Sequence, residues 1–106
     1  MKTRIWLSFD LGVRGDYESL YAWLDDHDAK ECGAGVAFLA YAYKKDLFVE
    51  LRDDLETVLE ATNRPRIYIV HTVGPKRAAS GRWLFGGRKS PPWSGFGSGN
   101  GNEVDR

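Results

Sequence analysis

The order in which strand and helix patterns alternate is the feature of this sequence that most restricts its fold. Apolar and polar residues alternate over residues 4–11, which predicts a half-buried strand. Apolar residues then recur at helical spacing from Asp16 to about Ala29, with Asp16 as the expected N-cap. A continuous apolar run over residues 36–43 predicts a second strand. Strands and helices therefore alternate from the start of the chain.

The pattern continues in the same way to residue 73. Residues 46–61 carry an apolar stripe opposite a charged side and predict a second helix, and the β-branched run at 66–73 predicts a third strand. The segment between residues 30 and 36 leaves room for one short edge strand. This order predicts an α+β fold: a ferredoxin-like two-layer sandwich with two helices on one face of an antiparallel sheet.

The other face of this sheet is predicted to lack helix cover. Alternation places Trp6, Ser8 and Asp10 on that face, and the apolar run at 36–43 would expose further apolar side chains there. Large exposed apolar patches usually mark interfaces. We therefore expect a homodimer that forms through the open sheet face.

Charge is distributed unevenly along the chain. Fifteen Lys and Arg balance fifteen Asp and Glu, which excludes a uniformly basic nucleic-acid coat. Residues 1–73 nevertheless hold nine bases and thirteen acids, whereas residues 74–102 hold five bases and no acid. We predict a core at 1–73, a basic, aromatic, Gly-rich extension at 74–97 with a short strand at 82–85, and a flexible tail at 98–106.

The predicted extension interleaves cations with aromatic rings. Such cations neutralise phosphates, and exposed rings stack on unpaired bases. The candidate nucleic-acid-binding residues are Lys76, Arg77, Arg82, Trp83, Arg88, Lys89 and Trp93. Two alternatives remain open: Trp83 and Phe85 pack a last strand onto the sheet, or the Pro- and Trp-containing segment docks on a partner protein.

Asp10 is the candidate metal ligand and the candidate catalytic residue. It ends the first predicted strand, where one carboxylate can hold Mg²⁺ together with water and phosphate oxygens. The alternative is that Asp10 only caps the following turn through its side chain. Mg²⁺ is the single cofactor that the sequence suggests.

The remaining composition concerns the cellular compartment. The single cysteine, Cys32, cannot form an internal disulfide, and no apolar run approaches the roughly 18 residues of a membrane helix. We expect a cytoplasmic protein without a signal peptide or membrane span.

Two segments of the core resemble a known family. The stretch IWLSFDLGVRGDYESLYAWL resembles the opening of the small CRISPR-associated Cas-two family and its virulence-associated-protein-D-like and SinR-like relatives. The residues that carry this match are Asp10, Leu11, Gly15, Asp16, Tyr17, Leu20 and Tyr21. The helix at 46–61 with RPRIYIVHTV resembles the second helix and following strand of that family, so the resemblance covers residues 3–73.

The resemblance implies a ferredoxin-like fold, a homodimer and association with DNA or RNA. Some relatives are metal-dependent nucleases whose strand-end Asp matches Asp10. We therefore expect a small protein that associates with nucleic acid. If it is an enzyme, the resemblance implies a metal-dependent endonuclease in which Asp10 holds the metal. The alternative is a non-catalytic interaction module, antitoxin-like or a complex subunit, that binds a partner through the open sheet face or the C-terminal arm.

Overall fold

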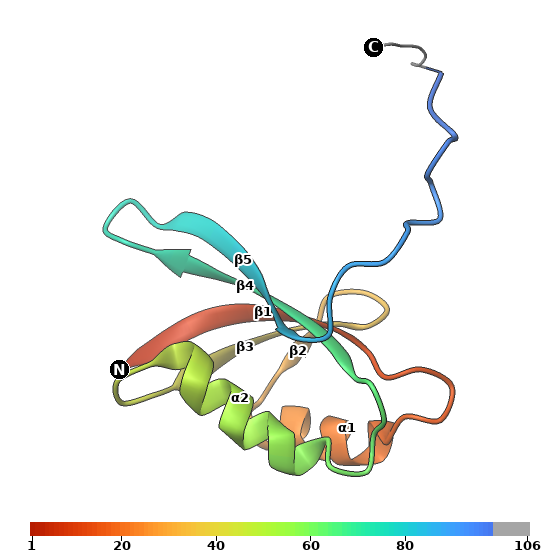
Figure 1. Cartoon of the computed structure of the whole chain (residues 1–106). Helices are drawn as coiled ribbons and strands as arrows, with labels where there is room; N and C mark the ends of the chain where they lie inside the picture. Colours follow the sequence, from red (N-terminus) through yellow and green to blue (C-terminus); the bar gives the residue numbers. More distant parts are fainter. Residues whose placement is uncertain (99–106) are drawn as a thin grey trace.

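The structure, a computed structural model, describes residues 1–98 of the 106-residue chain. Its elements are β1 (Lys2–Asp10), α1 (Tyr17–Asp26), β2 (Lys30–Glu31), β3 (Val36–Ala42), α2 (Leu47–Val58), β4 (Arg66–Val73) and β5 (Ala78–Phe85). The strands form one open antiparallel sheet in the order β2-β3-β1-β4-β5, and both helices lie on the same side of it (Figure 1). The predicted α+β fold, with two helices on one face of an antiparallel sheet, is confirmed.

The hydrophobic core lies between the sheet and the two helices. Burial follows the alternation predicted for the first strand, since Ile5 and Leu7 are fully buried and their neighbours are not. The same alternation runs through β3 and β4. The fully buried side chains are Ile5, Leu7, Leu20, Leu51, Leu55, Ile67 and Ile69. The apolar run at 36–43 thus has one buried and one open face.

Both helices begin at the predicted aspartates. Asp16 Oδ1 accepts from the Ser19 N–H at 3.0 Å, and Asp46 Oδ1 accepts from the Phe48 N–H at 3.0 Å. Helix α1 ends before Ala29 because acidic residues crowd the negative end of its dipole and Asp28 takes a left-handed φ of 54°. Within residues 1–98, neither helix combines the length and the apolar character needed to cross a membrane.

The last strand is longer than the sequence predicts. Strand β5 begins at Ala78 rather than Arg82 and pairs with β4 from Ile67 to Val73, with a bulge between Ile67 and Tyr68. The first part of the predicted extension therefore belongs to the sheet. Residues 86–98 follow it and contain no helix or strand. The predicted flexible tail at 98–106 lies, except for its first residue, outside the described residues.

The start of α2 carries a pH-dependent contribution to stability. The Glu50 carboxylate accepts backbone N–H groups of Lys44, Lys45 and Asp46 at 2.8–3.0 Å, and these hydrogen bonds lower its pKa to about 2. Since the folded pKa lies below the unfolded one, this stabilisation is present above about pH 4.5 and is lost as the pH falls toward 2.

We expect Glu50→Gln to lower the midpoint of thermal unfolding at pH 7, and the difference from the wild type to shrink below pH 4.5. Thermal melts followed by circular dichroism between pH 2.5 and 7 measure this difference. Glu56→Gln, at an exposed position of the same helix, is the matched control. A difference that stays constant with pH would contradict the assignment.

Candidate nucleic-acid interface

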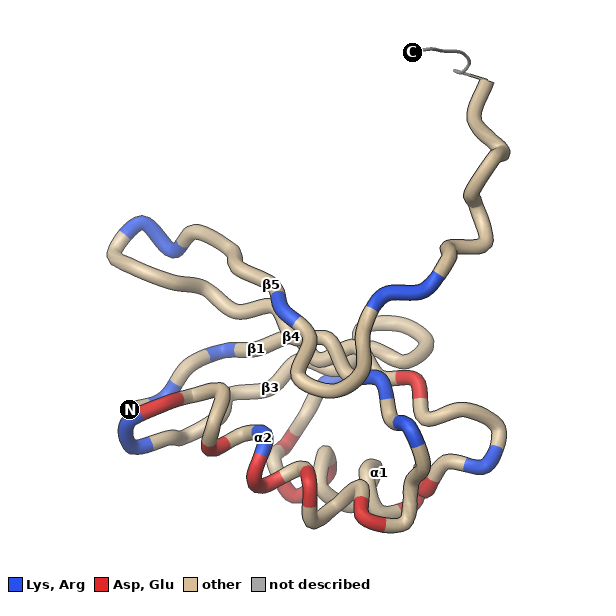
Figure 2. Tube along the Cα trace, viewed as in Figure 1, with Lys and Arg blue, Asp and Glu red and all other residues tan. Residues whose placement is uncertain are grey.

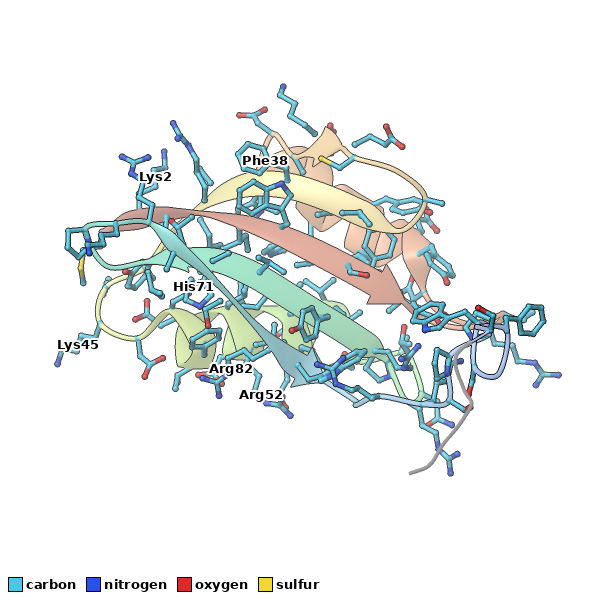
Figure 3. The ribbon with its side chains drawn as sticks, turned by 90° about the horizontal axis from the view of Figure 1, so that it is seen from above. Lys2, Phe38, Lys45, Arg52, His71 and Arg82 are labelled. Carbon is cyan, nitrogen blue, oxygen red and sulfur yellow. The ribbon has the colours of Figure 1, made fainter. Side chains whose placement is uncertain are left out.

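The side of the sheet opposite the helices is uncovered, and we call it the open face. Figure 3 views the sheet from this side, with Phe38 on it and α2 behind the strands. The open face includes Lys2, Arg4, Trp6, Ser8 and Asp10 of β1, Phe38 and Ala40 of β3, Tyr68, Val70 and Thr72 of β4, and Gly81 and Trp83 of β5. It combines aromatic, small and basic side chains.

An aromatic pair lies in the middle of the open face. Trp6 and Phe38 are register partners on β1 and β3, and their ring centroids are 4.9 Å apart with 43° between the ring planes. Trp6 is 37% exposed although it lies on a central strand. The Trp6 ring surface is left uncovered although its strand is central. A flat ligand can therefore stack on it.

A second aromatic pair lies toward the β5 edge. The rings of Tyr68 and Trp83 meet edge to face with centroids 5.1 Å apart, and the Arg66 guanidinium lies 5.0 Å from the Trp83 ring. Gly81 makes room for Tyr68, because a Cβ there would overlap the Tyr68 Oη. Trp83 Nε1 is buried and has no hydrogen-bond partner among residues 1–98. Trp83 therefore packs against the sheet, which is the alternative in which Trp83 and Phe85 belong to a last strand.

The chain after β5 passes over one end of the open face. Arg66 Nε donates to the carbonyl oxygen of Gly87 at 3.2 Å, and the Arg88 guanidinium lies 5.7 Å from the Tyr68 ring. Trp93, farther along, is 73% exposed. Residues 87–89 thus cover the Tyr68 end, while the Trp6 end stays open.

Asp10 is engaged in a turn and in ion pairs. Its Oδ1 accepts the Gly12 N–H at 3.0 Å, which is the Asx turn that the sequence allows. Its Oδ2 lies 3.2 Å from Arg66 Nη1 and 4.0 Å from Lys89 Nζ. The Gly12 hydrogen bond, with Lys89 and Arg66 nearby, holds the pKa of Asp10 below its ordinary value. The carboxylate is therefore ionised and already paired with cations at neutral pH.

The environment of Asp10 differs from that of an acidic metal site. Within residues 1–98, no group of three or more His, Cys, Asp or Glu side chains is placed to hold a metal ion. The groups nearest to Asp10 are cations, which repel Mg²⁺. A metal at Asp10 would have to displace these partners.

The other predicted binding residues do not form one surface. Lys76 and Arg77 lie in the β4–β5 turn, at the other end of the sheet from Lys89. Arg82 points to the helix side, where its guanidinium lies 3.9 Å from the Phe48 ring of α2 (Figure 3). The structure therefore separates the seven candidates into the turn, the helix side, the β5 edge and the arm.

Charge is divided unevenly between the helical segments and the rest of the described chain. The helical segments 16–28 and 46–60 hold eleven acids and one base, whereas the rest of residues 1–98 holds two acids and thirteen bases. Figure 2 shows acidic residues along the helices and basic residues on the hairpin, the loops and the arm. A polyanion is consequently repelled from the helical segments and attracted to the strands, loops and arm that carry the bases.

Comparisons with known proteins give no relative. Neither the protein-family models, nor the curated proteins, nor the solved structures contain a significant match to the chain. The resemblance to the Cas-two-like family thus stays a prediction made from residues 3–73. The candidate site rests on its geometry.

Several residues of this site are absent from the sequence prediction. Phe38 lies within an apolar run that has no polar alternation, so the run itself does not tell which side chains face outward. Arg4 is two positions before Trp6, with the buried Ile5 between them. This alternation is the signal that could have placed Arg4 on the open face.

Proposed function

We propose that the protein binds single-stranded nucleic acid on its open face. The observation that carries this proposal is the Trp6–Phe38 pair on two neighbouring strands, in which Trp6 is 37% exposed and Phe38 is half-buried, on the side of the sheet away from the acidic helices. Aromatic rings stack on bases of any sequence, and surrounding cations neutralise the phosphates. The open face supplies both kinds of contact.

The geometry favours unpaired bases over a duplex. Stacking on Trp6 requires access to the flat side of a base, which a duplex hides between its base pairs. The Trp6–Phe38 pair lies on the central strands β1 and β3, and not on the projecting β4–β5 hairpin, which is the two-stranded ribbon of this molecule that could enter a major groove. Sequence selectivity is accordingly expected to be modest.

The proposed core arrangement is ferredoxin-like. Its support is the succession of β1, α1, β2, β3, α2 and β4 with the strand order β2-β3-β1-β4, to which β5 adds an edge strand. The Cas-two-like resemblance implies the same arrangement and the same class of partner. The resemblance and the geometry of the open face thus favour the same class of partner, whereas the fold alone does not specify one.

A binding role has more support than a nuclease role. Catalysis by a metal at Asp10 would need a carboxylate that is free to bind Mg²⁺, whereas Arg66 and Lys89 neutralise it. The same ion pairs suit a binding protein, because they remove a negative charge from the end of the open face.

Direct titration tests the proposed function. We expect fluorescence anisotropy to detect binding of a labelled dodecamer of deoxythymidine or uridine at low salt. The logarithm of the affinity should fall linearly with the logarithm of the salt concentration, by about 0.7 for each phosphate bound. A duplex of the same length should bind more weakly. Equal affinity for duplex and single strand, or no binding, would contradict the proposal.

Two additions to this titration separate the rival functions. With Mg²⁺ or Mn²⁺ present the oligonucleotide should stay intact, and cleavage that disappears in Asp10→Ala would instead support the nuclease. Light scattering measures whether two copies associate, and a dimer that Trp6→Ala dissociates is one that forms through the open face. Because that face cannot hold a second copy and a strand at once, persistence of such a dimer when the strand binds would exclude the open face as the binding surface.

A further inference from the structure

One end of the open face is hollowed beside Trp6. The hollow has a volume of about 690 Å³ and lies where β1 begins, β4 ends and the β4–β5 turn closes. Its lining residues are Lys2, Thr3, Arg4, Trp6, Ala40, Thr72, Gly74 and Arg77. It is at the opposite end of β1 from Asp10 and from the arm residues 87–89.

The charges around the hollow have one sign. Lys2 and Arg4 come from β1 and Arg77 comes from the turn, and none of the lining residues carries a carboxylate. Within residues 1–98, none of these three cations makes an ion pair. Three unpaired cations that converge from two segments favour an anion between them.

The backbone of the turn holds Arg77 at this place. The Arg77 N–H donates to the Gly74 carbonyl oxygen at 3.1 Å, and both residues have left-handed φ angles, of 54° and 71°. This conformation suits Gly74 and is uncommon for an arginine. The turn therefore places a cation at the rim of the hollow through its main chain.

The hollow shares Trp6 with the aromatic pair, so a stacking surface and an anion site adjoin each other. We propose that this hollow binds the phosphate of the nucleotide whose base stacks on Trp6. The inference rests on the proposed function and specifies it: the unit recognised is one base with its adjacent phosphate. Arg4 and Arg77 supply guanidinium groups, which bind phosphate through two parallel hydrogen bonds.

Salt dependence distinguishes a phosphate contact from a general effect of charge. We expect the double variant Arg4→Gln/Arg77→Gln to bind the labelled deoxythymidine dodecamer more weakly and to lower the slope of log affinity against log salt by about 0.7, the value for one phosphate. The matched control is Arg14→Gln/Arg64→Gln, which removes two exposed cations from loops outside the hollow. The control should retain the wild-type slope.

A monomer competition provides the second measurement. Thymidine monophosphate should displace the dodecamer from the wild type at a lower concentration than thymidine does. From Arg4→Gln/Arg77→Gln, the two compounds should displace the dodecamer at equal concentrations. If the dodecamer still binds through Trp6 but the slope is unchanged, or is lowered equally in both double variants, the phosphate site is overturned. The proposed function would then still stand. A wild type that does not bind the dodecamer would overturn the proposed function and this inference with it.

Discussion

Replacing Trp6 or Phe38 by alanine is expected to weaken the binding of a single-stranded oligonucleotide about fivefold to more than 100-fold, because stacking of one base on an aromatic ring contributes about 1–3 kcal/mol. Both rings belong to the pair at the centre of the open face. Anisotropy titrations of the two variants and the wild type at one salt concentration measure the effect.

The controls separate stacking on Trp6 from apolar burial and from the loss of an exposed aromatic ring elsewhere. Trp6→Leu keeps an apolar side chain but removes the ring, so it should bind nearly as weakly as Trp6→Ala. Tyr21→Ala removes an aromatic ring that is 54% exposed on α1, away from the open face, and should retain wild-type affinity. Equal affinities of Trp6→Ala and Tyr21→Ala would show that the strand binds elsewhere.

Leu51→Ala is expected to destabilise the fold by about 2–5 kcal/mol, since it removes a fully buried side chain from α2 and leaves a cavity against the sheet. A domain of this size has a total stability of about 5–15 kcal/mol. The midpoint of thermal unfolding should therefore fall by roughly 10 °C or more. Thermal and urea unfolding measure the change.

Val49→Ala is the matched control for this prediction. Val49 lies in the same helix and is 54% exposed, so its truncation should change stability by no more than about 0.5 kcal/mol. Similar losses for the two variants would mean that α2 does not pack on the sheet through Leu51.

The unequal charge of the two layers explains how a chain of zero net charge can meet a polyanion. Among residues 1–98, eleven of the thirteen acids lie in the helical segments, and thirteen of the fourteen bases lie in the strands, loops and arm. Over distances shorter than about 10 Å, the local charge acts on a ligand more strongly than the total does. Binding on the open face is therefore expected to depend strongly on salt.

Local patterns were sufficient to predict most of the secondary structure. Alternation around Ile5 and Leu7, helical spacing, and the cap at Asp16 each arise from interactions within a few residues. The first half of β5 gave no such signal. Its Ala, Ser and Gly residues have little preference for strands and pair because β4 offers an unpaired edge.

The candidate site shows the same division between local and distant interactions. Alternation alone placed Trp6 on the uncovered face and Asp10 beside a turn. The neighbours of these residues come from distant segments. Trp6 contacts Phe38 of β3, and Asp10 pairs with Arg66 of β4 and Lys89 of the arm. No sequence pattern contains these distances, because they depend on strand order and register.

By itself, the sequence determined the periodicity, the cap at Asp16, the open face of β1 and the unequal charge of its segments, since all of these depend on residues close together in the chain. Only the tertiary structure decided that the predicted binding residues would separate, with Arg82 on the helix side and Trp83 packed on Tyr68. It also brought Lys2, Arg4 and Arg77 to one hollow beside Trp6. The physical reason is that sheet pairing juxtaposes residues far apart in the chain, and side-chain pattern alone does not specify which strands pair.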